Sequence, residues 1–241
     1  MSEFTEEIKA KLMQVSTATL CTALFKRGLR NQYIQNVYPL NSDLPNMVGP
    51  AYTLRYIPAR EDRNGLEVFK RPDHPQRVAV EECPVGAVLV MDSRKDARVA
   101  SAGSILIQRL AQRGVVGVVT DGGFRDSPEI ANFTIPAYHS RPSAPTNLGF
   151  NEAIDLNVPI ACGDVAVFPG DILVGDAEGV VVIPSALVAE IAQECIEMTS
   201  FEDFVMEEVK KGAAVIGLYP PTNPESQRKY EAWKATRKGT Q

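Results

Sequence analysis

The sequence predicts an α/β fold in which a parallel βαβ core is followed by a mixed or antiparallel β meander, with helices flanking both at the two ends. Short apolar runs alternate with helical patterns between residues 87 and 139, and this spacing implies parallel strands joined by right-handed crossovers. Four more apolar runs, separated by Gly-Asp, Pro-Gly-Asp and Asp-Ala-Glu-Gly turns, lie between residues 158 and 183. Helical periodicity marks residues 5–26 and 186–212.

A chain of 241 residues with 44% hydrophobic composition is long enough to bury a sizeable core. We expect one domain over residues 1–218 and a charged tail, with helical character at its end, over residues 219–241. The net charge of −5 and the pI near 5.2 argue against a general affinity for nucleic acid or anionic membranes. We therefore expect neither as a partner.

The cysteines and the N-terminus indicate the compartment. Cys21, Cys83, Cys162 and Cys195 are scattered without a close pair, which is typical of reduced, mostly buried thiols and gives no zinc-type spacing. The N-terminus lacks a basic segment followed by an apolar one, and no apolar run approaches membrane-spanning length. These features predict a cytoplasmic location.

The first third of the chain reads as scaffold. A helix is expected over residues 5–26, with Gly28 closing it, and a strand over residues 47–57 that turns Tyr52, Leu54 and Tyr56 to one side. The charged stretch from Pro58 to His74 is interrupted by glycine and proline, so we expect a surface loop or short helix that leaves His74 at the surface.

The centre of the chain predicts a helix, a buried strand and a sharp turn. Apolar residues at helical spacing indicate a helix over residues 103–113, which Gly114 ends. Residues 87–91 and 115–120 are β-branched, apolar runs of the kind found in parallel strands covered on both faces. Ser127-Pro128 then resembles an N-cap with proline at the first helical position, opening a short helix.

After a strand near residues 134–139, the predicted meander and C-terminal helices complete the domain. The expected strands are Val158–Cys162, Val165–Phe168, Ile172–Val174 and Val180–Ile183. We expect one helix over residues 186–199 and a second that opens at a capping box, Ser200-Phe-Glu-Asp203, and ends at Gly212.

Several common catalytic motifs are missing from the sequence. There is no nucleophile elbow, no phosphate-binding loop with its lysine, no dinucleotide fingerprint and no zinc-protease motif. Two histidines are too few for a histidine-rich metal site, and His139 at a strand end is better explained as a loop or packing residue than as a base.

Charged Arg125 and Asp126 follow the carboxyl end of the buried strand, where ligands bind in open α/β sheets. Asp126 suits a hard cation such as Mg²⁺ or Mn²⁺, and the Arg125 fork suits a substrate carboxylate. Residues 103–106 open the central helix with free backbone N–H groups that favour an anion, and Gly103 admits close approach. The alternative is that Arg125 and Asp126 pair with groups elsewhere and only cap structure.

Four ordered motifs resemble the RraA-like family, which holds the regulator of ribonuclease activity A and class II aldolases that cleave 4-hydroxy-4-methyl-2-oxoglutarate and decarboxylate oxaloacetate. The resemblance runs from about residue 10 to 215. The motifs are Met-Val-Gly-Pro-Ala-x-Thr-Leu at 47–54, Gly-x-x-Leu at 103–106, Arg-Gly-Val-x-Gly-Val-Val-x-Asp-Gly-Gly-x-Arg-Asp at 113–126 and Pro-Gly-Asp-x-x-x-Gly-Asp-x-x-Gly-Val-Val-x-x-Pro at 169–184.

The resemblance implies a swivelling β/β/α domain that forms a homo-trimer or homo-hexamer with its sites between subunits. By that resemblance Arg125 binds the pyruvyl carboxylate, Asp126 ligates the divalent metal, and the amides of Ile105 and Leu106 assist. Where the aldolases have an acid holding a metal-bound water, this chain has Ser104. A glutamate that the family takes from a neighbouring subunit falls near Glu202 or Asp203, and Asp96 or Arg98 could substitute for it.

The leading hypothesis is a divalent-metal-dependent lyase that cleaves or decarboxylates a small 2-oxo acid through a metal-stabilised enolate. The intact Arg125-Asp126 pair favours it. A second hypothesis, to which Ser104 lends weight, is a non-catalytic regulator that binds a ribonuclease or another protein. A third is a sugar-acid dehydratase or hydrolase that uses the same metal enolate.

Overall fold

The computed structural model describes residues 4–238. Residues 1–3 of the predicted domain and residues 239–241 of the predicted tail lie outside it. The helices are α1 Glu6–Leu12, α2 Thr17–Lys26, α3 Pro75–Glu82, α4 Ser104–Gln112, α5 Ser127–Ile130, α6 Val188–Lys210 and α7 Pro224–Lys238, with 3₁₀ turns η1 Leu66–Lys70, η2 Asn147–Gly149 and η3 Ser185–Leu187. The strands are β1 Tyr38–Pro39, β2 Met47–Pro58, β3 Val88–Asp92, β4 Ala100–Ala102, β5 Gly117–Thr120, β6 Gly123–Phe124, β7 Ala137–His139, β8 Arg141–Pro142, β9 Asn151–Leu156, β10 Ile160–Cys162, β11 Val165–Val167, β12 Ile172–Gly175 and β13 Val180–Ile183.

The main sheet has the predicted parallel core with antiparallel additions. Its order is β1-β7-β5-β3-β2-β12-β13, with β9 paired to β2. Strands β2, β3, β5 and β7 run parallel, whereas β12 and β13 join antiparallel. A smaller parallel sheet, β4-β6-β8, lies beside it, and β10 and β11 form an antiparallel pair. The α/β class with a mixed meander is thereby confirmed.

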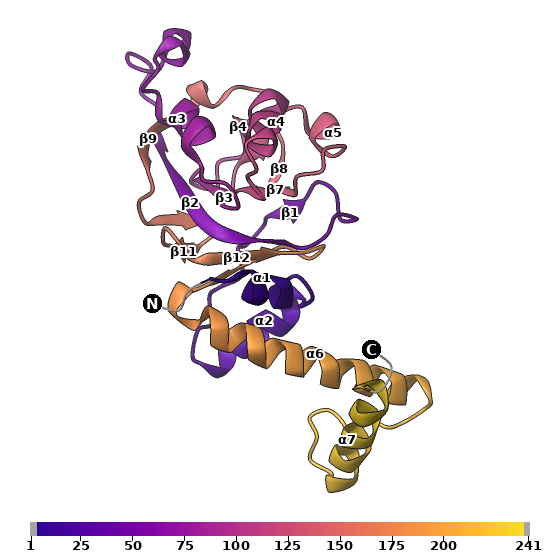
Figure 1. The fold of residues 1–241 in the computed structure, drawn as a ribbon. Coiled ribbons are helices and arrows are strands. Elements are labelled where there is room, and N and C mark those ends of the chain that lie inside the picture. The colour runs from indigo at the N-terminus through magenta and orange to yellow at the C-terminus, as the bar shows by residue number, and fades with distance from the viewer. Residues whose placement is uncertain (1–3, 239–241) are drawn as a thin grey trace.

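The central strands are covered on both faces, as their apolar sequences predict. Leu89 and Val118 pack with Ile107 of α4 in one cluster that also takes in α3 and α5. Their neighbours Val88 and Val119 point into a second cluster with β11 and β13. In Figure 1 the helices α3, α4 and α5 lie on the side of the main sheet away from α1, α2 and α6.

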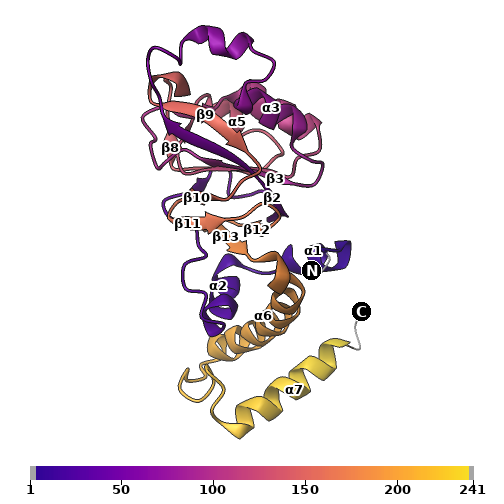
Figure 2. The same ribbon diagram turned by 90° about the vertical axis from the view of Figure 1, so that its left-hand side faces the viewer.

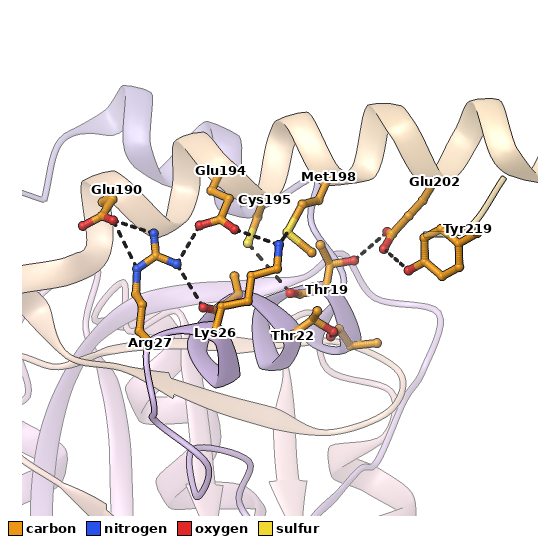
Figure 3. Close-up of polar contacts among 12 residues, drawn as sticks. Thr19, Thr22, Lys26, Arg27, Glu190, Glu194, Cys195, Met198, Glu202 and Tyr219 are labelled. Atoms are coloured by element: carbon orange, nitrogen blue, oxygen red, sulfur yellow. Dashed lines mark hydrogen bonds and ion pairs between the residues drawn. The ribbon is translucent and has the colours of Figure 1, made fainter. Parts of the chain in front are cut away.

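Helices from the two ends of the chain pack together under the β12–β13 hairpin. Leu20 of α2 and Ile191 of α6 share a cluster with Val181 of β13. Ion pairs line the outer side of this contact: Lys26 pairs with Glu194 at 3.0 Å, and Arg27 pairs with Glu190 at 2.6 Å (Figure 3). The prediction of flanking helices is confirmed, and the two ends of the chain together form one layer.

The C-terminal helices differ from the prediction, because α6 is one continuous helix rather than two. Ser200 lies in its interior, where the sequence has neither glycine nor proline to interrupt the backbone hydrogen bonds, so the capping-box pattern is not used. The far half of α6 extends from the main body, and α7 packs against it there (Figures 1 and 2). That contact is a small cluster of Phe204, Leu218 and Tyr230.

The N-terminal prediction of one helix over residues 5–26 is also wrong, because α1 and α2 are separate. Ser16 takes an extended conformation and its hydroxyl accepts a hydrogen bond from Thr19 N, which caps α2. Thr17 is held in addition by Asp176, whose carboxylate accepts bonds from its N–H at 2.7 Å and its hydroxyl at 2.9 Å. A hydrogen bond to a residue 159 positions later in the sequence thus stabilises the break between α1 and α2.

Two local predictions need correction. The cap of α5 is Asp126 rather than Ser127, and Pro128 occupies its first turn. His74 is buried rather than at the surface, since it lies edge-on to Phe69 with ring centroids 5.4 Å apart. Burial and the nearby Arg77 lower the pKa of His74.

Across residues 4–238, no helix combines the length and apolar character needed to cross a bilayer.

Candidate functional site

The predicted site residues meet where β4 and β6 end side by side. Gly103 follows β4 and opens α4, while Arg125 follows β6 and precedes α5. The Arg125 N–H donates to the carbonyl of Ala102 at 3.0 Å, which extends the β4–β6 pairing by one bond. The short parallel sheet therefore fixes the spacing between the helix start and the Arg125-Asp126 pair.

Asp126 is in a backbone conformation that few residues adopt. It is the N-cap of α5 with φ of 58°, in the left-handed region that aspartate tolerates better than most side chains. Its Oδ2 lies 3.3 Å from Ser104 N, 3.4 Å from Ser104 Oγ and 3.5 Å from Arg125 Nε. All three contacts converge on one oxygen. Within residues 4–238, Oδ1 accepts no hydrogen bond, so one carboxylate oxygen is free for a ligand.

The close packing around residue 103 leaves room only for glycine. A Cβ at this position would meet Cγ of Arg125 at 2.7 Å and Oδ2 of Asp126 at 2.9 Å. Any larger residue would push against both charged side chains. The close approach predicted for Gly103 is therefore used by the protein's own Arg125-Asp126 pair.

The start of α4 offers fewer free amides than the sequence suggests. The Ser104 N–H points to Asp126, and the Leu106 N–H donates to the carbonyl of Gly103 at 3.1 Å. Ile105 N–H has no acceptor in the described part of the chain, and its side chain is 83% exposed. The anion-binding potential of this helix start therefore centres on the Ile105 amide.

A pocket of about 300 Å³ opens beside these residues. Five predicted positions line it: Gly103, Ile105, Leu106, Arg125 and Asp126. The rest of the lining comes from residues that the sequence did not single out: Phe69, Gln76, Arg77, Ala100, Ala102, Thr146 and Asn147. They come from η1, α3, β4 and the turn into η2, segments whose meeting depends on the tertiary fold.

The weaker candidates lie elsewhere in this chain. Glu202 on α6 accepts hydrogen bonds from Thr19 Oγ1 at 2.9 Å and from the Tyr219 hydroxyl at 3.1 Å (Figure 3), and Asp203 beside it is exposed. Asp96 is bound by Arg98 at 2.6 Å, outside the pocket lining. None of these carboxylates joins Arg125 and Asp126 within one chain. A contribution from a neighbouring subunit stays a prediction.

The Asp-Gly-Gly segment before the site is built from buried polar groups. Asp121 accepts bonds from the backbone N–H groups of Ser93 at 2.7 Å, Lys95 at 3.1 Å and Gly163 at 3.2 Å. Burial raises the pKa of Asp121 to about 6 despite these donors. At Gly122 a Cβ would meet the Cβ of Ser93 at 2.6 Å. This packing holds the strand that delivers Arg125 and Asp126.

The donor set around Asp126 fits a hard divalent cation with one protein ligand. Among residues 4–238, no three His, Cys, Asp or Glu side chains cluster as a metal cage. Asp126 lines the pocket, and its Oδ1 accepts no hydrogen bond from the described residues, so one carboxylate oxygen is available to a cation. Mg²⁺ and Mn²⁺ accept such a site when water and substrate oxygens complete the octahedron.

The other titratable candidates serve packing. His139 is buried against Phe124, with ring centroids 5.6 Å apart, and burial lowers its pKa to about 4. It is therefore neutral near pH 7 and part of the core, as predicted. The four cysteines are free thiols, and burial raises the pKa of each.

The chain matches the family model described as "RraA-like: Aldolase/RraA" over residues 17–182. It is 33% identical over 178 residues to a protein of Halalkalibacterium halodurans named "Putative 4-hydroxy-4-methyl-2-oxoglutarate aldolase", covering 73% of this chain and 77% of that one.

Solved structures show the same fold. Streptomyces coelicolor RraAS2, described as an unusual member of the RNase ES inhibitor RraA protein family, superposes with a TM-score of 0.72 and 29% identity, covering 85% of this chain and 98% of that one. An uncharacterized protein from Pseudomonas syringae pv. tomato superposes with a TM-score of 0.75 at 21% identity, covering 89% of this chain and 98% of that one, which speaks for the fold alone.

Proposed function

Because the chain belongs to the RraA-like family, we propose that it is a divalent-metal-dependent lyase that cleaves or decarboxylates a small 2-oxo acid. One observation carries the proposal: Arg125 and Asp126 lie together at a pocket that is also lined by Ile105, whose N–H has no acceptor among the described residues. A guanidinium and a backbone N–H are donors suited to the carboxylate and keto oxygens of such a substrate, and a carboxylate with a free oxygen would hold the divalent cation.

Each residue has a distinct task in this proposal. The Arg125 fork binds the substrate carboxylate through two parallel hydrogen bonds, and its side chain is about half exposed (51%). The Ile105 N–H donates to an oxygen that gains negative charge when the bond to the departing fragment breaks. Asp126 would hold the cation, while Ser104 and Arg125 contact its Oδ2 and orient the carboxylate. The cation, when bound, supplies Lewis-acid stabilisation of the developing enolate charge.

A regulator that binds a ribonuclease or another protein is the second candidate. Two observations favour it: Ser104 adds no charge beside Asp126, and the S. coelicolor relative is described within a family of RNase inhibitors. A metal-dependent dehydratase or hydrolase acting on sugar acids would use the same Arg125-Asp126 pair, and it is an outcome of the same experiment.

We further propose a homo-trimer or homo-hexamer with the site between subunits. The exposed apolar side chain of Ile105 at the pocket supports this, because a neighbouring subunit would cover it. Light scattering tests the assembly. A monomer that turns over substrate at nanomolar concentration contradicts it.

The test of function is a substrate screen with the purified protein. Oxaloacetate, 4-hydroxy-2-oxo acids and 2-oxo-3-deoxy sugar acids are assayed with Mg²⁺ or Mn²⁺, and with EDTA as control. We expect metal-dependent release of pyruvate or carbon dioxide that Asp126→Asn abolishes and Asp155→Asn, a change at an exposed carboxylate on β9, leaves intact. Turnover that survives EDTA or Asp126→Asn contradicts the metal assignment. Absence of turnover on every substrate favours the regulator.

A further inference from the structure

Strand β4 contains one residue more than its partner β6 can pair with. The register between the two strands shifts between Ala100 and Ala102, which face consecutive residues of β6, so Ser101 is an extra residue without a partner there. An insertion of this kind bends its strand, and it is common next to active sites, where it re-aims neighbouring side chains. Gly103, which precedes α4 at the pocket, follows Ser101 by two positions.

The small sheet is too short to fix this register by itself. Strand β4 has three residues, and β6 and β8 have two each. So little pairing provides few backbone hydrogen bonds and is marginal in water. A slip of one residue would displace a strand by about 3.3 Å and turn its side chains to the opposite face. Contacts from outside the small sheet must therefore hold the extra residue.

Three buried hydroxyls provide such contacts. Ser101 Oγ lies 2.6 Å from Ser93 Oγ and 2.9 Å from Thr120 Oγ1, and the last two atoms lie 3.0 Å apart. We call Ser93, Ser101 and Thr120 the hydroxyl triangle. Each of its side chains is buried, and its three hydrogen bonds close when each hydroxyl donates to the next. Because Ser93 follows β3 and Thr120 ends β5, the hydroxyl triangle ties β4 to the carboxyl ends of two central strands of the main sheet.

The backbone carbonyl of Ser101 is bonded to the main body as well. It accepts hydrogen bonds from the Tyr56 hydroxyl at 3.2 Å and from Gln76 Nε2 at 2.5 Å. Tyr56 belongs to β2 and Gln76 to α3, and both side chains are buried. An extra residue in a strand lacks ladder partners, and here side chains from two other elements replace them.

The hydroxyl triangle also holds the start of β6. Thr120 Oγ1 accepts a hydrogen bond from the N–H of Gly122 at 3.0 Å, directly before β6. A Cβ at Gly122 would lie 2.8 Å from Ser101 Oγ, so this turn and the triangle are in direct contact. Two residues of β6 then lead to Arg125, whose N–H donates to the carbonyl of Ala102 at 3.0 Å. The same three hydroxyls thus support both strands that carry the site.

We propose that Ser101 is a positioning residue for the Arg125-Asp126 pair, and that the hydroxyl triangle sets the register of β4 against β6. No member of the triangle lines the pocket, so its members act on a ligand only through these strands. The inference rests on the proposed function only for the reaction that it affects. Loss of one hydroxyl leaves a buried polar group of its neighbours unpaired, which favours a slipped register that moves the start of α4 away from Asp126.

Variants that remove one hydroxyl each test the proposal. Ser101→Ala and Thr120→Val remove a hydroxyl of the triangle, whereas Thr120→Ser keeps it. Thr53→Val is the matched control. Thr53 is buried on β2, its hydroxyl donates to the carbonyl of Val158 at 2.5 Å, and it belongs to neither the triangle nor the pocket lining.

Amide hydrogen exchange reports the register without any need for turnover. The Arg125 amide, which bonds to Ala102, is compared with the Val118 amide, which bonds to the carbonyl of Pro136 in the main sheet. We expect the ratio of the Arg125 rate to the Val118 rate to rise about tenfold or more in the two variants that lack a triangle hydroxyl. It should stay at the wild-type value in the other two. A general loss of stability does not raise this ratio, because it accelerates exchange at Val118 at least as much.

Steady-state decarboxylation of oxaloacetate with Mg²⁺ measures the consequence for the site, with the free energy of unfolding determined in parallel. A misplacement of about 1 Å costs on the order of 10²-fold in rate, so kcat should fall about tenfold or more in Ser101→Ala and Thr120→Val. Thr53→Val should lose stability to a similar degree and keep kcat within about threefold of wild type. Thr120→Ser should retain most of the wild-type kcat.

Several outcomes overturn the proposal: an unchanged exchange ratio in both variants that lack a triangle hydroxyl, an equal rise in Thr53→Val, or a raised ratio with unchanged kcat. Thr120→Val covers the case in which Ser101→Ala folds poorly. The failure of the proposed lyase is distinguishable from these results. In that case wild type turns over no substrate, and the exchange ratio alone supports or overturns the role of the hydroxyl triangle in setting the register.

Discussion

Replacing Gly103 by alanine tests how closely the site depends on the helix start. The added Cβ would lie 2.7 Å from Cγ of Arg125, and ordinary contacts begin at 3.4 Å, so Arg125 must move by about 0.7 Å or more. Oδ2 of Asp126, 2.9 Å from the same Cβ, must move as well. The φ of −126° at Gly103 is accessible to alanine, so the backbone itself does not oppose the change.

The expected effect on activity exceeds the effect on stability. A misplacement of about 1 Å in a catalytic constellation costs on the order of 10²-fold in rate, or about 2.7 kcal/mol. Overpacking costs typically ~1–3 kcal/mol of stability, and the low end applies here because Arg125 and Asp126 are partly exposed and can shift toward solvent. We therefore expect a folded protein with a large loss of kcat/KM.

The assay is metal-dependent oxaloacetate decarboxylation, with the free energy of unfolding measured in parallel by denaturant titration. Gly65→Ala is the matched control, since a Cβ at Gly65 meets nothing within 4 Å, and it should leave kcat/KM unchanged. A folded Gly103→Ala protein whose kcat/KM stays within threefold of wild type would refute the placement of the site.

Three further changes have defined outcomes. Arg125→Lys replaces a bidentate fork by a point charge, so kcat/KM should fall by about 30- to 1000-fold in steady-state assays. An unchanged kcat/KM would mean that another residue binds the substrate carboxylate. If the chain is a regulator that lost an acid, Ser104→Asp should raise aldolase or decarboxylase activity at least tenfold. If it is a specialised enzyme, the same change should damage its native reaction. Measuring the aldolase or decarboxylase activity and the native activity in wild type and in Ser104→Asp decides between the two. His139 is neutral in the folded state down to a pKa of about 4, whereas the unfolded chain binds its proton near pH 6.5, so this residue stabilises the fold less as pH falls through that window. Denaturant titrations at pH 4 and 6.5 should show the advantage of wild type over His139→Gln shrinking by about 3 kcal/mol at the lower pH, and an equal difference at both pH values contradicts a buried neutral imidazole.

Local signals were sufficient for the centre of the chain. Gly114 ends α4 with φ of 82°, and the apolar run after it forms β5, buried on both faces. Arg125 and Asp126 were expected directly beyond that strand, whereas they follow β6, a two-residue strand of the smaller sheet that the sequence did not predict. Periodicity and glycine act within a few residues, so the sequence shows them directly.

Predictions failed where distant contacts decide the structure. Asp176 stabilises the break between α1 and α2 from 159 residues away, and the burial of His74 depends on packing against its surroundings. Strands β6 and β8 have two residues each, too few for any periodic signal. The α3 wall of the pocket was missed for the same reason, because Gln76 and Asn147 are 71 positions apart and neither belongs to a recognisable motif.

The long helix α6 belongs to two hydrophobic clusters that do not share residues. Ile191 and Cys195 are anchored in the cluster beneath the β12–β13 hairpin, whereas Phe204 contributes to the small aromatic cluster with α7. Because a cluster of so few buried side chains contributes much less free energy than the main core, the end of α6 and α7 should open as a separate cooperative unit. Amide protons there would exchange with solvent through this partial unfolding while the strands that carry Arg125 and Asp126 remain protected. Heat or denaturant would then release the C-terminal helices first, and the folded state would comprise two species that differ in length of ordered chain but share one intact pocket.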